Sequence, residues 1–205
     1  MKRLLTGLAV VALVAGCAAD NSPDSPPEAV AAAAFRAGGP KTLTVFTMVN
    51  NRTGSGGHTA LMVKASQTVI FDPAGSFRDP RVVERGDVLY GMSPNWVQSY
   101  KSAHARDTYH VVSQEIPVTA AQAEQALQLV ASNGAVPGAY CANATTSIMA
   151  KVDGFQNIEN TFYPLKFMEQ VATLPGVKTT KLFENDEGDI IDGVRAAELA
   201  ASNSE

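Results

Sequence analysis

The chain has 205 residues, of which 20 are acidic and 16 basic, and its formal net charge is −4 at pH 7. A length of this order suits one domain with a sizeable core, since domains commonly contain about 100 to 150 residues. No basic cluster of the kind that binds phosphate backbones is present, so we expect no nucleic-acid partner. The two cysteines, Cys17 and Cys141, are too few for a disulfide framework.

The N-terminus has the layout of a secretory signal. Lys2 and Arg3 precede an apolar run from Leu4 to Val14, which is well short of the roughly 20 residues that a membrane-spanning helix needs. The small residues before Cys17 resemble a bacterial lipobox, which implies cleavage before Cys17 and attachment of lipid to it. The alternative is an ordinary signal peptide with a chance cysteine.

These features predict a lipoprotein signal peptide over residues 1–16 and a lipid on Cys17 that holds the protein to a membrane. We expect a location in the cell envelope. If the organism has two membranes, Ala18 after the lipidated cysteine resembles the pattern for sorting to the outer membrane, facing the periplasm.

Composition divides the remaining chain into three parts. Residues 17–41 are rich in Pro, Ser, Asp and Ala and predict a flexible tether, with room for a short helix between Glu28 and Arg36. We expect residues 42–183 to form the folded domain. Residues 184–205 carry seven acidic side chains against Arg195 alone, and a solvated acidic tail is favoured over a hidden carboxylate site.

Within the domain, alternating polar and apolar residues predict strands, and helical spacing predicts three helices. A capping box at Thr119–Gln122 starts the first helix, Cys141 leads into the second, and Pro164 opens the third. We expect an irregular segment from Ser93 to Arg106. The predicted strands are Thr42–Val49, His58–Lys64, Thr68–Asp72, Gly86–Met92, Thr108–Val118 and Lys178–Phe183.

The register of the hairpin after His58 follows from burial. A three-residue loop at Ala65–Gln67 pairs Val63 with Val69 and makes one face wholly apolar, whereas a two-residue loop would move Asp72 into that apolar face. The first register is preferred. It places His58 and Asp72 on the opposite face, diagonal to each other and within reach.

Cys141 follows the chain-breaking pair Pro137–Gly138 and starts a helix, and helical spacing turns its side chain inward. The N–H groups at a helix N-terminus favour the thiolate and lower the pKa of a cysteine there. If Cys17 is lipidated, Cys141 is a free thiol. A buried, unreactive cysteine is the alternative.

A cysteine hydrolase needs a thiolate, an imidazole, a group that orients the imidazole, and donors to the oxyanion. Cys141, His58 and Asp72 are the candidates for the first three roles, and the Cys141 N–H is a candidate for the fourth. Asn143 is a weaker candidate, because a residue two positions along a helix points elsewhere. Of the other histidines, we expect His104 to be exposed and favour a structural role for His110 over a site role.

The order of these motifs adds a family resemblance. His58–Val63 after a glycine-rich turn, Val69–Pro73, Ile116–Thr119, Tyr140–Asn143 and Tyr163–Leu165 resemble, in that succession, the circularly permuted NlpC-type papain-fold family. The resemblance implies an α+β fold with an antiparallel sheet packed against a Cys-bearing helix and two further helices. It also implies catalytic roles for His58 and Cys141, and less firmly for Asp72, because the third residue varies in that family.

This family includes peptidoglycan peptide hydrolases, lipid-directed hydrolases and acyltransferases, all of which use an acyl-thioester intermediate. Hydrolase and transferase both remain open. Peptidoglycan amide bonds are slightly favoured over lipid acyl groups as substrate, because a tethered domain reaches the wall. No cofactor or metal is expected, since three dispersed histidines without an HExxH motif give no ligand set. The rival hypothesis is a non-catalytic envelope-binding lipoprotein with a degenerate cleft.

Overall fold

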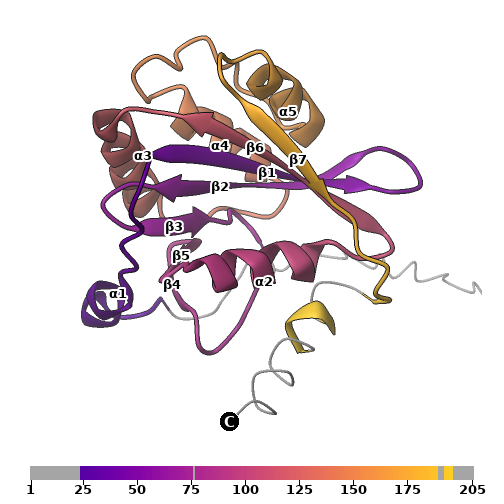
Figure 1. The fold of residues 1–205 in the computed structure, drawn as a ribbon, viewed down its shortest axis with the longest axis horizontal. Helices are drawn as coiled ribbons and strands as arrows, with labels where there is room; N and C mark the ends of the chain where they lie inside the picture. The colour runs from indigo at the N-terminus through magenta and orange to yellow at the C-terminus, as the bar shows by residue number, and fades with distance from the viewer. Residues whose placement is uncertain (1–23, 76, 189–191, 196–205) are drawn as a thin grey trace, which may run out of the picture.

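The computed structural model describes residues 24–75, 77–188 and 192–195, and these form a mixed α+β fold. One seven-stranded antiparallel sheet, in the order β4-β5-β3-β2-β1-β6-β7, runs through this part of the chain (Figure 1). The strands are β1 (Thr42–Asn50), β2 (Gly56–Lys64), β3 (Thr68–Phe71), β4 (Val83–Arg85), β5 (Val88–Tyr90), β6 (Tyr109–Pro117) and β7 (Lys178–Leu182). The helices are α1 (Pro27–Ala33), α2 (Pro94–His104), α3 (Ala120–Asn133), α4 (Cys141–Met149) and α5 (Pro164–Ala172).

Both faces of the central strands are buried. Successive side chains of β1 alternate between two cores, because neighbouring residues of a strand point to opposite faces. Leu43 and Val45 belong to the core under α3, α4 and α5, whereas Phe46 and Met48 belong to the core under α2. Figure 1 shows α2 on one side of the sheet and α3 and α4 on the other.

The segment from Ser93 to Arg106, expected to be irregular, is mostly the helix α2. Ser93 is its N-cap and accepts a hydrogen bond from the Trp96 N–H, and Pro94 occupies the first turn. Serine before proline is a helix-start signal, since the proline φ is already helical and its missing N–H would have no intrahelical partner. The expectation failed because the polar residues of this helix obscure its apolar face.

The predicted strand Gly86–Met92 is shorter and belongs to a hairpin. β4 and β5 are joined at Gly86 and Asp87, whose φ angles are 57° and 61°. Two consecutive residues with positive φ make the type of tight turn that matches the twist of the flanking strands. The hairpin extends the sheet by one strand that the sequence did not predict.

The expected tether over residues 17–41 differs from the structure from Asp24 onward. The Thr68 N–H donates to the Phe35 carbonyl at 2.8 Å, and the Ser25 N–H donates to the Glu84 carbonyl at 2.8 Å. Val30 and Ala33 of α1 pack against the core. Their small apolar side chains cover the β3–β5 side of the sheet, so this segment is part of the domain.

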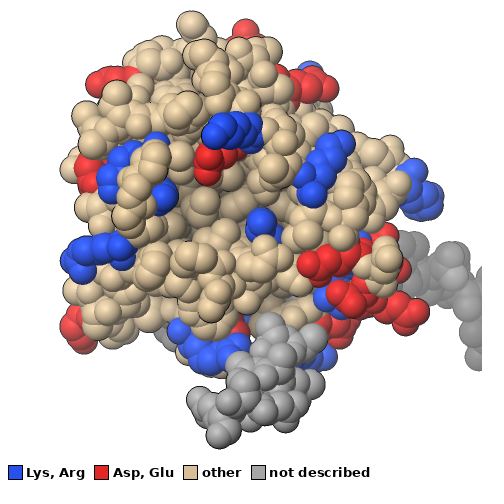
Figure 2. All heavy atoms as spheres, in the orientation of Figure 1, with Lys and Arg blue, Asp and Glu red and all other residues tan. Residues whose placement is uncertain are grey.

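The first 23 residues, and with them the expected signal peptide and Cys17, lie outside the described residues. In the parts that are described, none of the helices has both the length and the apolar character needed to cross a bilayer. Acidic and basic side chains are interspersed over the face in Figure 2.

The described part of the acidic segment contacts α2. The Ser102 hydroxyl donates to the Glu184 carboxylate at 2.6 Å, and the Arg106 guanidinium donates to the Glu187 carbonyl at 2.6 Å. Val194 is buried in the core under α2. These contacts fix one end of the segment beside the helix that also reaches the candidate site.

Candidate active site

The hairpin of β2 and β3 has the predicted register. Val63 pairs with Val69 and Leu61 pairs with Phe71, the last residue of β3. β2 starts five residues before Leu61, so its first half extends past the end of β3. His58 therefore lies beside the chain that leaves β3, and its Nε2 is 2.7 Å from Asp72 Oδ1.

Asp72 is held as an ionised acceptor. It is buried, and its Oδ1 accepts from both His58 Nε2 and the Tyr100 hydroxyl, the latter at 2.6 Å. Burial alone would raise the pKa of the carboxyl, but the charge and hydrogen bond of His58 and the bond from Tyr100 hold the pKa at about 2. A carboxylate can only accept, so the His58 Nε2 carries the hydrogen of this bond.

Cys141 is the first residue of α4, and it is a free cysteine with 7% of its surface exposed. Ala139, two residues earlier, has a φ of 68°, and Tyr140 at the N-cap makes no side-chain capping bond. The first N–H groups of the helix are therefore left for other partners. α4 packs on β2, which brings its N-terminus to the open edge of that strand beyond the end of β3.

Cys141 and His58 are neighbours, because each contributes to the pKa shift of the other. Because Nε2 of His58 is bonded to Asp72, Nδ1 is the ring nitrogen left for the thiol. Burial raises the pKa of the thiol, but the hydrogen bond and charge of His58 and the N–H groups of Thr59 and Ala142 outweigh it, and the net pKa is lowered. Asp72 is thus hydrogen-bonded to His58, and His58 is electrostatically coupled to Cys141.

The contacts that lower the pKa of Cys141 raise the pKa of His58. Burial lowers the pKa of the imidazole, but the charge and hydrogen bond of Asp72, followed by those of Cys141, raise the pKa to about 10. A lowered thiol pKa beside a raised imidazole pKa shifts the balance of the pair toward thiolate and imidazolium. This is the charge state of an activated cysteine nucleophile.

Two residues of α2 complete the surroundings, and the sequence predicted neither. Tyr100 is fully buried and donates to Asp72. His104 was expected to be exposed, and this is wrong: it is 9% exposed, and its Nδ1 lies 2.8 Å from the Tyr100 carbonyl. Recognition of Ser93–Pro94 as a helix start would have placed Tyr100 and His104 four residues apart on one helix face.

His104 differs from His58 in charge. Burial is the main cause that lowers its pKa, to about 4, so the ring is neutral at pH 7. The Tyr100 carbonyl can only accept, which places the hydrogen on Nδ1 and leaves a lone pair on Nε2. The His58 and His104 rings are nearly parallel, with centroids 6.0 Å apart.

The other polar candidates lie apart from this cluster. His110 Nδ1 is 2.7 Å from Asn51 Oδ1, and its ring stacks on Phe183, which agrees with the structural role that was favoured. The Asn143 amide donates to the Asn160 side chain. Neither residue takes part in the Cys141 chain.

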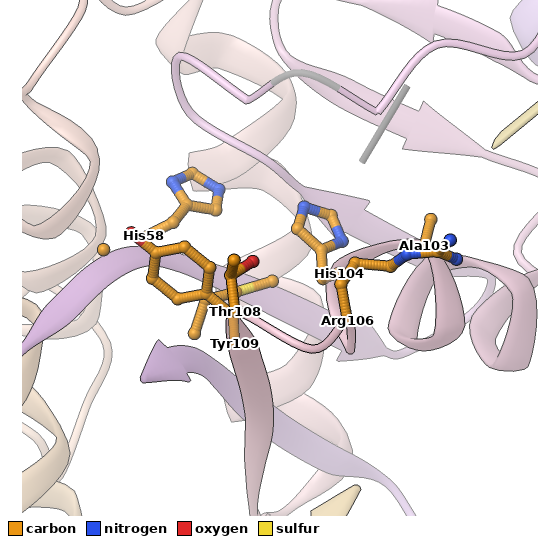
Figure 3. Close-up of a pocket in the computed structure, with 8 residues that line it drawn as sticks. His58, Ala103, His104, Arg106, Thr108 and Tyr109 are labelled. Carbon is orange, nitrogen blue, oxygen red and sulfur yellow. The ribbon is translucent and has the colours of Figure 1, made fainter. Parts of the chain in front are cut away.

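A pocket of about 200 Å³ opens on the far side of His58 (Figure 3). His58 and His104 both line it, and they turn ring nitrogens toward each other. Its other lining residues are Met48, Gly57, Ala103, Arg106, Thr108 and Tyr109. The pocket gives small solutes access to the imidazole rings from the α2 side.

Exposed aromatic residues lie just before α4 and just before α5. Tyr140 directly precedes Cys141, is 46% exposed, and packs edge-on against Phe162 with ring centroids 5.2 Å apart. Tyr163 is 63% exposed. A Cβ on Gly56 would touch Pro164, so the start of α5 lies against the start of β2. Tyr140 and Phe162 together expose aromatic surface at the N-terminal end of α4.

Comparison with protein families, curated proteins and solved structures gives no match to this chain.

Proposed function

We propose that this chain is a cysteine acyl-transfer enzyme of the cell envelope, in which Cys141 is the nucleophile, His58 the acid and base, and Asp72 the orienting residue. The observation that carries the proposal is the 2.7 Å bond between His58 Nε2 and Asp72 Oδ1, in a histidine whose charge lowers the pKa of the free Cys141 thiol at the start of α4. A purely structural cysteine has no need of a buried, ionised carboxylate on the far side of its imidazole partner.

The first half of the reaction forms a thioester. The Cys141 sulfur attacks the acyl carbonyl carbon, and the carbonyl oxygen becomes an oxyanion that the Cys141 N–H at the helix start can stabilise. As the tetrahedral intermediate collapses, His58 gives its Nδ1 proton to the leaving amine or alcohol. Asp72 keeps the ring in the tautomer and orientation that this transfer needs.

The second half of the reaction breaks the thioester and regenerates the free enzyme. Neutral His58 takes a proton from the attacking water, alcohol or amine, whose oxygen or nitrogen bonds to the thioester carbon. The carbon–sulfur bond breaks, and the thiolate–imidazolium pair is restored. Water as acceptor gives a hydrolase, and an alcohol or amine gives a transferase.

The proposed fold is the circularly permuted papain-like arrangement. Support comes from chain order, since the histidine hairpin β2–β3 precedes the cysteine helix α4, and from the packing of α4 on β2. The proposed substrates are peptide amide bonds of peptidoglycan or acyl groups of lipids. A lipid on Cys17, implied by the N-terminal sequence, would hold the enzyme at the membrane close to both.

Trapping the intermediate tests this proposal. Mature protein is mixed with muropeptides or with phospholipid vesicles, quenched in acid, and its mass is measured. We expect an acyl adduct located on Cys141, accumulation of the released amine or alcohol, and neither in Cys141→Ala. Turnover that persists in Cys141→Ala would remove Cys141 as the nucleophile. Stoichiometric binding without release or adduct would favour the envelope-binding alternative.

A further inference from the structure

His104 has a ring nitrogen that the proposed reaction does not use. Its Nδ1 is occupied by the Tyr100 carbonyl, and within the described chain its Nε2 makes no hydrogen bond. The side chain is nine-tenths buried. His104 lines the pocket, so a water or a ligand that enters there can reach this ring.

Two further ligand atoms converge on the same point. One nitrogen of His58, one oxygen of Asp72 and one nitrogen of His104 all lie within 4.8 Å of one another. His58 Nε2 and Asp72 Oδ1 already approach to 2.7 Å. Ligand atoms around a tetrahedral zinc ion sit about 2.0–2.2 Å from the metal, so small rotations of these side chains bring all three into coordinating range.

The three residues come from different elements that are fixed by packing. His58 lies in β2, Asp72 directly follows β3, and His104 ends α2. The Tyr100 carbonyl fixes His104 through the ring nitrogen that faces away, in the manner by which outer hydrogen bonds orient metal-binding histidines. The site is therefore held in shape by the same contacts that build the catalytic cluster.

The pocket in Figure 3 provides the entrance. Arg106 is the cation among its lining residues, but its guanidinium donates to the Glu187 carbonyl and lies 4.0 Å from the Asp186 carboxylate. These groups offset its charge. A water entering through the pocket would supply the fourth ligand that a three-residue zinc site leaves open.

We propose that His58, Asp72 and His104 bind a divalent transition-metal ion such as Zn²⁺ from the pocket side, and that this ion reversibly blocks the Cys141 site. The metal takes the place of the proton on His58 Nε2, which is released to solvent, and Asp72 bonds to the metal. His58 then loses the acceptor that orients it, and its bound ring is a poor acid for the leaving group. The blocking half rests on the proposed function, whereas the binding half does not.

Titration of the chelator-treated, full-length protein with Zn²⁺ and with Co²⁺ tests the site. We expect one ion per chain and the visible absorption bands of four-coordinate Co²⁺. His104→Asn keeps an N–H donor for the Tyr100 carbonyl but lacks the second nitrogen, and we expect it to bind at least ~10-fold more weakly. His110→Asn is the matched control from outside the cluster and should bind as the wild type does.

A second variant separates this site from simple capture of the metal by the thiol. Cys141→Ser should keep the affinity and the Co²⁺ bands, and no sulfur-to-cobalt charge-transfer band should appear in the wild type. The proposal is overturned if His104→Asn binds as tightly as the wild type, or if Cys141→Ser abolishes binding. Metal that binds as described but leaves thioester formation unchanged would overturn the blocking half alone.

Discussion

The charge of Asp72 determines the state of the two residues beyond it. Replacing Asp72 by Asn preserves the shape but removes the charge that is the leading cause of the raised His58 pKa. With a less basic imidazole, the Cys141 thiolate is stabilised less. We expect the rate of Cys141 alkylation by iodoacetamide at pH 6 to fall by about 10-fold or more, since one pKa unit is a factor of ten in thiolate population.

Asp79→Asn is the control for this substitution. Asp79 is a buried carboxylate bonded to Arg81 rather than to a histidine. We expect the rate of Cys141 alkylation in Asp79→Asn to stay within twofold of the wild-type rate. An unchanged rate in Asp72→Asn would show that the carboxylate does not tune the thiol.

Tyr100 is a positioning residue, because it touches Asp72 and not the reacting atoms. Tyr100→Phe deletes a buried donor to an ionised carboxylate, and hydrogen bonds to charged groups contribute about 1.5–3 kcal/mol. We expect a loss of about that size in the free energy of unfolding by urea, together with a changed pH profile of Cys141 alkylation. Tyr90→Phe, at a buried tyrosine remote from Asp72, should leave the pH profile unaltered. If the pH profile of Cys141 alkylation is unchanged in Tyr100→Phe, Tyr100 contributes only to packing and not to the position of Asp72.

Among the individual site residues, the sequence predicted those whose placement depends on local rules. Strand alternation and loop length brought His58 and Asp72 together, and helix-start signals placed Cys141. The sequence did not predict Tyr100 and His104 as site residues. They lie 28 and 32 positions after Asp72, and their approach to it depends on how α2 packs across the sheet, which no local pattern encodes.

Among the structural elements, the turn after β3 fixes the direction in which Asp72 points. Its N–H group at Gly75 donates to the Asp72 carbonyl, and a Cβ at position 75 would overlap the Asp72 carboxylate. We therefore expect Gly75→Ala to displace Asp72, lower the free energy of unfolding by about 2 kcal/mol or more, and raise the pKa of the Cys141 thiol. Gly38→Ala, where a Cβ meets nothing within 4 Å, should change neither quantity. A Gly75→Ala protein with wild-type stability and thiol pKa would contradict this role of the turn.

The elements themselves were predicted unevenly. The capping box at Thr119 and the helix from Cys141 were confirmed, because capping and breaking residues mark both of them. α2 was missed because its start signal is brief and its buried face carries tyrosine and histidine. The strand β4 was missed because three residues are too few to show alternation.

The free energy of unfolding of the whole molecule should depend on pH through the Asp72–His58 pair. The folded pKa of Asp72, about 2, lies below its ordinary value of 3.8, so its stabilisation is present above pH 4 and is lost as the pH falls through about 2. The folded pKa of His58, about 10, lies above its ordinary value of 6.5, so its stabilisation is present below pH 6.5 and is lost as the pH rises through about 10.

Stability measured across pH checks this expectation. The difference in unfolding free energy between wild type and Asp72→Asn should be largest from pH 4 to 6.5, about 3 kcal/mol, because breaking a buried ion pair leaves one charge without compensation. The difference should narrow at pH 2 and at pH 10. A difference that is constant across this range would mean that the pair is not charged in the folded protein.

The mixed α+β class was predictable because strand and helix periodicities are separate signals in this chain. The extent of the domain was not. Residues 24–41 have the composition of a linker, yet their backbone groups pair with β3 and β4, a use that composition does not reveal. The charge of the acidic segment predicted a solvated tail, whereas Val194 of this segment is buried in the core under α2.

The pH dependence of Cys141 alkylation is the most direct test of the thiolate–imidazolium pair on which the account depends. Iodoacetamide labelling of the folded protein is followed by mass spectrometry of the peptide that contains Cys141, which separates this residue from Cys17. We predict labelling faster than that of free cysteine at pH 6 to 7, with a midpoint below the pKa of about 8.5 of an ordinary thiol, and loss of this advantage in His58→Ala. A midpoint at or above 8.5, or a profile that His58→Ala leaves unchanged, would contradict the central claim.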